Sequence, residues 1–247
     1  MQKSPARSNS HRPPLGTLYG IGIGPGDPEL ITVKALNHLR AAPVVAFPAG
    51  INGQPGVAER TIEQWLSPTQ QRLPLSFPYV QDEKALDSAW RKAAEIVWPY
   101  LQEGNVVFAS EGDISFYSTF TYLAQYLKQQ HPESVVDAIA GVSSPMAAAA
   151  ALGIPLACQA QQVAILPALY NIHQLETVLS WADVIVLMKV SSVYEQVWQI
   201  LKQRHLLAHS YVIENATTSR QVIHSELQHC PALKLPYFSL MIIKAAH

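Results

Sequence analysis

The sequence predicts an α/β protein made of two α/β domains, and three observations lead to this prediction. Apolar, β-rich runs alternate with helix-like segments through the first half of the chain, which is typical of a parallel sheet covered by helices on both faces. The last part is rich in strands joined by short links, which favours antiparallel or mixed pairing. A polar break, "KQQHPES" at 128–134, interrupts the pattern in mid-chain.

The first half contains strands and helices in alternation. Residues 32–42 are expected to form a helix with Thr32 as its N-cap, because a threonine directly precedes the apolar-periodic segment. The other elements expected here are strands at 17–23, 43–47 and 105–110 and helices at 82–102 and 116–130.

The second half continues with a strand at 135–141 and an alanine-rich helix at 144–153 that ends at Gly153. The remaining expected elements are a strand at 183–190, a helix at 192–204, and strands within 210–214, 220–227 and 237–244. We therefore expect a disordered tail at 1–14, an N-terminal α/β domain at 15–120 and a C-terminal α/β domain at 121–247.

Composition narrows the functional classes. The 247 residues carry a net charge of −1, so nothing global indicates binding to nucleic acid or to an anionic membrane. Residues 1–14 are basic and polar without the apolar stretch of a signal peptide, and no apolar run is long enough to span a bilayer. Cys158 and Cys230 lack paired spacing and are expected to be reduced thiols. A cytoplasmic protein is the expectation.

The glycine-rich segment "GIGIGPGDPEL" at 20–30 lies where the first strand gives way to a helix, which is a common place for a ligand-binding loop. It fails the dinucleotide fingerprint, because the third glycine would fall on Pro25 or on Asp27, and it lacks the Gly-Lys-Ser/Thr of a P-loop. Asp27 would also repel a phosphate. The loop therefore suits a ligand that is neutral or cationic where it meets the chain, or else it is only a tight connection with Asp27 and Glu29 near a helix N-terminus.

Two further loops occur in the same situation, between a strand and a helix. They are "SEGDISFYSTF" at 110–120 and "AGVSSPMAAAA" at 140–150. Ligands of open α/β sheets bind at the carboxyl ends of the strands, where these loops and the glycine loop would converge. Together they predict a binding cleft.

These stretches resemble the motifs of the tetrapyrrole (corrin/porphyrin) methyltransferases, which use S-adenosylmethionine. "GTLYGIGIGPGDPELITVKAL" resembles the family's opening signature, and "EGDISFYSTFTYL", "GVSS", "VLMK" (186–189) and "IENATTSRQVI" (213–223) resemble the later motifs in the expected order. The resemblance covers residues 15–244. The form of the second motif and its pairing with "GVSS" most resemble the branch that methylates C20 of precorrin-2 in cobalamin biosynthesis, giving precorrin-3A.

The resemblance implies two α/β domains of the tetrapyrrole methylase fold, with S-adenosylmethionine in the cleft and the tetrapyrrole in an open trough lined by the N-terminal domain. It also implies a homodimer. The residues that match the family's cofactor positions are Pro25, Glu111, Gly112, Asp113, Phe116, Ser143, Ser144, Met188 and Ala216.

Substrate contacts are expected from the glycine loop at Gly24, Gly26 and Asp27, and from the cationic residues Arg60, Lys189 and Arg220, which could pair with the carboxylates of a tetrapyrrole. Glu111 and Asp113 are the candidates for the base that removes a proton after methyl transfer.

Each residue has a structural alternative. Phe116 and Met188 could belong to the core, and Asp113 and Ser143 could cap helices. No metal site is expected, because His205 and His209 lack the acid of an H-E-x-x-H motif.

The chain also departs from the family pattern, with Ile114 where proline often follows Gly-Asp, Pro145 where a bulky residue is usual, and "TTSRQ" in the last motif. Alternative functions are methylation of cobalt-factor II or of another corrin intermediate, the same chemistry on uroporphyrinogen III or a protein, and a non-catalytic tetrapyrrole-binding protein on this fold.

Overall fold

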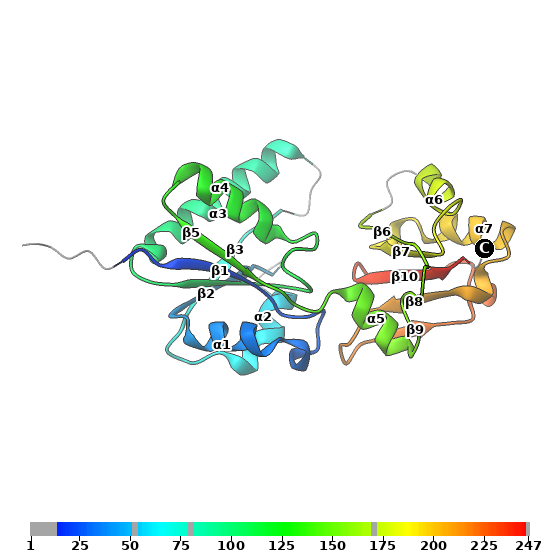
Figure 1. Cartoon of the computed structure of the whole chain (residues 1–247), viewed down its shortest axis with the longest axis horizontal. Coiled ribbons are helices and arrows are strands. Elements are labelled where there is room, and N and C mark those ends of the chain that lie inside the picture. Colours follow the sequence, from blue (N-terminus) through cyan, green and yellow to red (C-terminus); the bar gives the residue numbers. More distant parts are fainter. Residues whose placement is uncertain (1–13, 51–53, 79–81, 169–171, 246–247) are drawn as a thin grey trace, which may run out of the picture.

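The protein folds into two lobes, each built around its own five-stranded sheet (Figure 1). The structure is a computed structural model that describes residues 14–50, 54–78, 82–168 and 172–245. The expected tail at 1–14 lies almost entirely outside the described residues. No helix in the described part is long and apolar enough to cross a lipid bilayer.

The first sheet is parallel throughout, with the strand order β3-β2-β4-β1-β5. Its strands are β1 (Thr17–Gly22), β2 (Val44–Pro48), β3 (Gln71–Leu75), β4 (Val106–Ser110) and β5 (Val135–Ile139). Its helices are α1 (Val33–Ala41), α2 (Val57–Ile62), α3 (Glu83–Leu101) and α4 (Thr119–Gln130).

Helices cover both faces of this sheet, with α1 and α2 below it and α3 and α4 above it in Figure 1. Strand β4 is buried along its whole length, because it lies in the middle of the sheet and both of its faces are covered. Thr32 caps α1 as expected, with its Oγ1 accepting a hydrogen bond from the amide of Ala35 at 3.2 Å.

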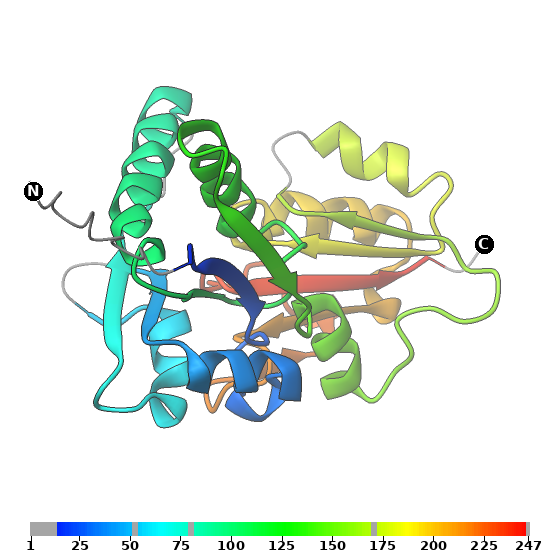
Figure 2. The same cartoon turned by 60° about the vertical axis from the view of Figure 1, so that its left-hand side comes forward.

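The second sheet is mixed, with the order β6-β7-β10-β8-β9. Its strands are β6 (Val163–Leu166), β7 (Val184–Met188), β8 (Ser210–Glu214), β9 (Val222–His224) and β10 (Ser239–Lys244). The strand latest in the sequence, β10, lies in the middle, antiparallel to both β7 and β8, and Figure 2 shows it in red between them.

The second sheet is also covered on both faces. Helices α6 (Ile172–Val178) and α7 (Tyr194–Gln203) bury one face in a large apolar cluster. Helix α5 (Ser144–Leu152) packs its alanines against the other face. It ends at Gly153, which takes the left-handed conformation expected of a C-cap, with φ of 67°.

The predicted strands and helices are confirmed with shifts of a few residues at their ends. Among the α-helices and strands of the described residues, four short elements were missed, namely α2, β3, β6 and α6. Strand β3 contains Pro74, which cannot donate to a ladder and disfavours a strand assignment, but β3 is an edge strand, where proline is tolerated.

The division of the chain between the sheets differs from the expected domain boundary at 120/121. Helix α4 packs against α3 and β4, and β5 pairs with β1, so both belong with the first sheet. The polar break at 128–134 includes the turn between α4 and β5. The chain passes to the second lobe only after β5.

Candidate functional site

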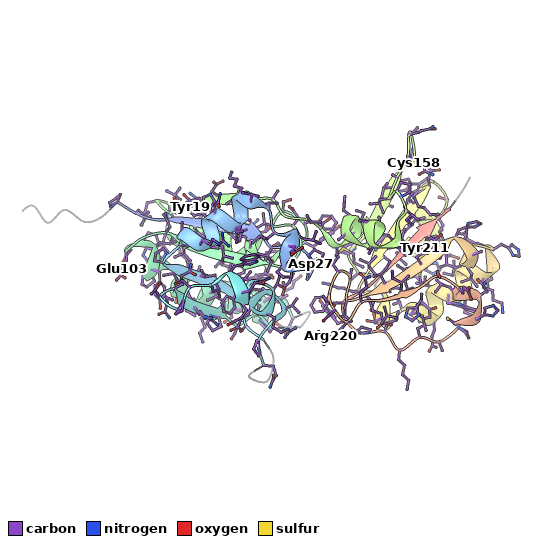
Figure 3. All side chains as sticks on the ribbon, turned by 90° about the horizontal axis from the view of Figure 1, so that it is seen from below. Tyr19, Asp27, Glu103, Cys158, Tyr211 and Arg220 are labelled. Carbon is purple, nitrogen blue, oxygen red and sulfur yellow. The ribbon has the colours of Figure 1, made fainter. Side chains whose placement is uncertain are left out.

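A cavity of about 1210 Å³ lies between the two lobes. The loops that line it follow β1, β2, β3, β4 and β5 in the first lobe and β6, β7 and β8 in the second. Carboxyl ends of parallel strands meet at one edge of a sheet, so each sheet turns this edge towards the cavity. Residues 237–240 also line the cavity, because β10 is antiparallel to β7 and β8 and begins at the edge where those two strands end. In Figure 3, Asp27 and Arg220 lie where the lobes meet.

Three glycines bring the ends of β1, β4 and β5 into direct backbone contact. A Cβ added at Gly22 would lie 2.7 Å from the carbonyl oxygen of Gly112 and 2.8 Å from Cα of Gly141. The amide of Gly112 also donates to the carbonyl of Gly24 at 2.8 Å, and the amide of Gly24 donates back at 3.2 Å. The glycine loop therefore needs its lack of side chains for close approach of backbone to backbone.

Asp113 uses both carboxylate oxygens to hold backbone in place. Its Oδ2 accepts from the amide of Gly141 at 2.7 Å, and its Oδ1 accepts from the amide of Ser115 at 2.9 Å and from the Ser115 hydroxyl. Burial raises the pKa of Asp113, but these hydrogen bonds outweigh burial and leave the pKa below its ordinary value. Asp113 is thus a weak base that ties the β4 loop to the β5 loop.

The pKa of Glu111 is shifted in the opposite direction to that of Asp113. Its Oε1 accepts from the amide of Ala58 at 3.0 Å. Burial raises the pKa of Glu111 above its ordinary value, against the opposing effects of backbone hydrogen bonds and of the positive charge of Arg60. Glu111 lines the cavity at the end of the central strand, so it can accept a proton there more readily than Asp113 can.

The glycine loop also contacts the second lobe. The amide of Asp27 donates to Oγ1 of Thr217 at 3.1 Å, and a Cβ at Gly26 would lie 2.3 Å from Cγ2 of Thr218. Thr217 has a φ of 67°, which is unusual for a β-branched residue. Loop 215–218 is therefore held in a strained form against the glycine loop.

We expect Thr217→Val to loosen this contact between the lobes. The variant leaves the partly buried amide of Asp27 without its acceptor, which costs about 1–3 kcal/mol in the free energy of unfolding. Urea denaturation measures this loss. The control is Thr177→Val, whose hydroxyl bonds only the carbonyl of His173 in its own helix and should change stability by less than about 0.5 kcal/mol. Equal losses in the two variants would contradict a role for the contact.

The structure brings the expected site residues together around the one cavity. Gly24 alone among them does not line it, because this residue pairs with Gly112 behind the loop. The expected residues that line the cavity are Pro25, Gly26, Asp27, Arg60, Glu111, Gly112, Asp113, Phe116, Ser143, Ser144, Met188, Lys189, Ala216 and Arg220.

The structure separates the residues that keep a purely structural role from those that do not. Ser143 occupies the N-cap position of α5, but its hydroxyl makes no capping hydrogen bond to that helix. Met188, at the end of β7, packs against the apolar cluster around α5 in agreement with its structural alternative, but it is only partly buried and also lines the cavity. Lys189 has a left-handed φ of 53° and places Nζ 5.4 Å from the ring centre of Tyr237. Asp27 does cap a short helix, accepting from the amide of Glu29 at 2.8 Å.

Sequence reasoning missed part of the cavity wall. The missed residues of the wall are Phe77 in the loop after β3, Leu86 and Trp90 on α3, and Tyr122 on α4. Thr217, which contacts the glycine loop, was also missed. The helical residues have the spacing of ordinary core positions, so no signal in one sequence distinguished them. The described residues contain no group of three or more His, Cys, Asp or Glu that could hold a metal ion.

Curated relatives are identical to this chain at about a third of the aligned residues. "Cobalamin biosynthesis protein CobIJ" of Mycobacterium bovis is 32% identical over 237 residues, which cover 92% of this chain and 46% of the relative. "Probable cobalt-precorrin-2 C(20)-methyltransferase" of Methanocaldococcus jannaschii is 33% identical and covers 76% and 77%. "Precorrin-2 C(20)-methyltransferase" of Sinorhizobium sp. is 29% identical and covers 93% and 95%. The chain thus spans about half the length of CobIJ but nearly all of the Sinorhizobium protein.

The fold has counterparts among solved structures. Uroporphyrin-III C-methyl transferase from Thermus thermophilus, complexed with S-adenyl homocysteine, superposes with a TM-score of 0.62 at 21% identity, covering 92% of this chain and 97% of that one. The sequence profile of the tetrapyrrole (corrin/porphyrin) methylases matches residues 17–230, which is most of the chain. With the motifs, two sheets and interlobe cavity already described, this match means that the chain belongs to the tetrapyrrole (corrin/porphyrin) methylases.

Proposed function

We propose that the protein is an S-adenosylmethionine-dependent methyltransferase that methylates C20 of precorrin-2, giving precorrin-3A in cobalamin biosynthesis. The observation that carries the proposal is that every residue matching a cofactor position of the family lines the same interlobe cavity. The names of the M. jannaschii and Sinorhizobium relatives support C20 as the position methylated. The complex of the Thermus structure supports the methyl donor.

The cavity suits this donor. When bound, S-adenosylmethionine supplies an electrophilic methyl group on a cationic sulfonium. Asp27, Glu111 and Asp113 make the adjoining wall acidic, and the close-packed glycines keep side chains away from it. We assign the donor contacts to Pro25, Glu111, Gly112, Asp113, Phe116, Ser143, Ser144, Met188 and Ala216.

The acceptor side is assigned to the remaining wall. Arg60, Lys189 and Arg220 present cationic groups to the cavity and can pair with the carboxylates of a tetrapyrrole. Gly26 and Asp27 form the loop between this region and the donor contacts, with Gly24 supporting it from behind.

Glu111 is the base in this proposal. The electron-rich carbon of the acceptor needs little activation, so holding donor and acceptor in line contributes most of the rate. The methylated carbon must then lose a proton. Asp113 is committed to three hydrogen bonds, whereas the raised pKa of Glu111 makes this carboxylate the better acceptor.

Anaerobic turnover tests the function. The purified protein is incubated with S-adenosylmethionine and either metal-free precorrin-2 or its cobalt complex, and the product is read by mass spectrometry. A gain of one methyl group on precorrin-2, located at C20 by NMR, is the expected result. Preference for the cobalt complex would favour the alternative acceptor. Donor binding without any turnover would favour a non-catalytic tetrapyrrole-binding protein.

The proposal also includes the homodimer and the cytoplasmic location that were expected from the sequence. Sedimentation equilibrium of the purified protein tests the first, with a mass of twice 27.2 kDa as the expected result.

A further inference from the structure

The order of strands divides the cavity wall into two ends. The loops after β1 and β5, which carry Pro25, Ser143 and Ser144, lie towards one edge of the first sheet. The loops after β2 and β3 lie towards the other edge, and the loop after β4 with Glu111 lies between them. Most of the proposed donor contacts in this lobe are therefore at or beyond the β4 loop, on the β1/β5 side.

The cavity is also lined by an aromatic wall, which we define as Phe77, just after β3, Trp90 on α3 and Tyr122 on α4. The rings of Trp90 and Tyr122 are stacked, with centroids 4.1 Å apart and planes inclined by 9°. Phe77 meets the core residue Phe108 edge-on, with centroids 6.2 Å apart. The wall is thus one flat stacked pair beside an anchored ring.

The side chains of the stacked pair are only partly buried by the rest of the protein. Tyr122 leaves 43% of its surface exposed, and Trp90, which stacks on it, is half-buried. Tyr126 is a second ring near Trp90, with centroids 6.0 Å apart, and its hydroxyl donates to Asp87. The fold therefore holds an exposed aromatic face in a fixed orientation on the cavity.

A second stacked pair, formed between α3 and the residue that caps α4, lies away from the cavity. Trp98 lies on α3 two turns after Trp90 and stacks on His131, with centroids 3.9 Å apart and planes inclined by 8°. Neither residue lines the cavity. The stacking of this pair therefore serves the fold and not the cavity, and the pair provides a matched control.

We propose that the Trp90–Tyr122 stack is the face against which the ring of the acceptor lies, with Tyr122 in contact and Trp90 as the positioning residue stacked on it. This inference rests on the proposed function, since it names the acceptor end of the same cavity. A tetrapyrrole ring offers a broad apolar face that an aromatic side chain can cover. Arg60, which also lines the cavity, can pair with a carboxylate at the rim of the ring.

The test uses the full chain with Tyr122→Leu and Trp90→Leu. Each variant is expected to raise KM for precorrin-2 about tenfold, while kcat and the Kd for S-adenosylmethionine stay within about twofold of wild type. Tyr122→Phe keeps the ring and should restore KM. Trp98→Leu removes the same side chain as Trp90→Leu from the same helix and should leave KM unchanged. Thermal unfolding of each variant reports any general loss of structure.

Binding of uroporphyrin III, a stable octacarboxylate macrocycle, separates this inference from the function itself. Suppose that wild type methylates no tetrapyrrole, while Tyr122→Leu weakens uroporphyrin binding and Trp98→Leu does not. This result would support the aromatic face as a binding surface and contradict the proposed function. If wild type methylates precorrin-2 and the Tyr122 and Trp90 variants keep its KM, the aromatic face falls alone. An equal rise in KM in Trp98→Leu also overturns it.

Discussion

Glu111→Gln is expected to slow methyl transfer by about 10²- to 10⁴-fold, which is the usual contribution of a positioned general base. The amide of glutamine can still accept the hydrogen bond from the Ala58 amide, so the loop should keep its shape. Because Glu111 is also assigned to the donor contacts, donor affinity is expected to fall as well, so the rates are compared at saturating S-adenosylmethionine. Single-turnover assays with precorrin-2 measure the rate, and titration calorimetry with S-adenosylmethionine measures the affinity.

The pH dependence of the same variant identifies the cause. Because burial raises the pKa of Glu111, the wild-type rate should rise with pH as this carboxylate loses its proton, and Glu111→Gln should lack that rise. The raised pKa also means that the folded state binds more protons than the unfolded state between the two pKa values. The free energy of unfolding of wild type should therefore decrease as pH rises through that range, and Glu111→Gln should remove the decrease.

The matched control is Glu59→Gln, which removes an acid next to Ala58 in α2 that does not line the cavity. Its rate should equal that of wild type. A full rate in Glu111→Gln, or the same pH profile in both proteins, would eliminate Glu111 as the base.

Gly141→Ala is expected to destabilise the protein by about 3 kcal/mol, at the upper end of the usual cost of overpacking. The new methyl carbon would lie 2.5 Å from the carbonyl oxygen of Gly112 and 2.6 Å from the carbonyl carbon of Gly22. Both neighbours are backbone, so no side-chain rotation can relieve the clash. Relief requires β1, β4 and β5 to move apart at their carboxyl ends, so donor affinity should fall as well.

Gly104→Ala provides the comparison. A Cβ there meets only Cγ of Pro43 at 3.7 Å, an ordinary contact, and the change in stability should be within about 0.5 kcal/mol. Urea denaturation of the two variants, with calorimetry for the donor, measures both effects. If Gly141→Ala were as stable as Gly104→Ala, the close packing of the three loops could not be the reason for these glycines.

The fold could be predicted from the sequence where pattern and structure coincide. Buried strands such as β4 are unbroken apolar runs, and α1 and α5 carry their end signals at Thr32 and Gly153. The boundary between the domains could not be located in this way. The polar stretch near 130 is an ordinary helix–strand turn, and only the pairing of β5 with β1 shows to which sheet it belongs.

The site was predictable to the extent that it lies in loops at the ends of strands. Such loops carry glycines, acids and hydroxyls whose spacing can be read, and these residues converge on one cavity. Trp90 and Tyr122 could not be found, since their exposure depends on how α3 packs against α4. The different chemistry of Glu111 and Asp113 was equally out of reach, because it depends on hydrogen bonds to Ala58 and Gly141, which are distant in sequence.

The central position of β10 has a consequence for biogenesis. All strands of the first sheet lie within residues 17–139, so this lobe can fold while the ribosome is still translating the second. The second sheet cannot, because β6–β7 and β8–β9 remain separate pairs until residues 239–244 have emerged and joined them. During that interval β7 and β8 each present an unpaired, apolar edge, which is the kind of edge that promotes aggregation. The nascent chain is therefore expected to be most prone to aggregation after β8 has emerged and before β10 joins the sheet.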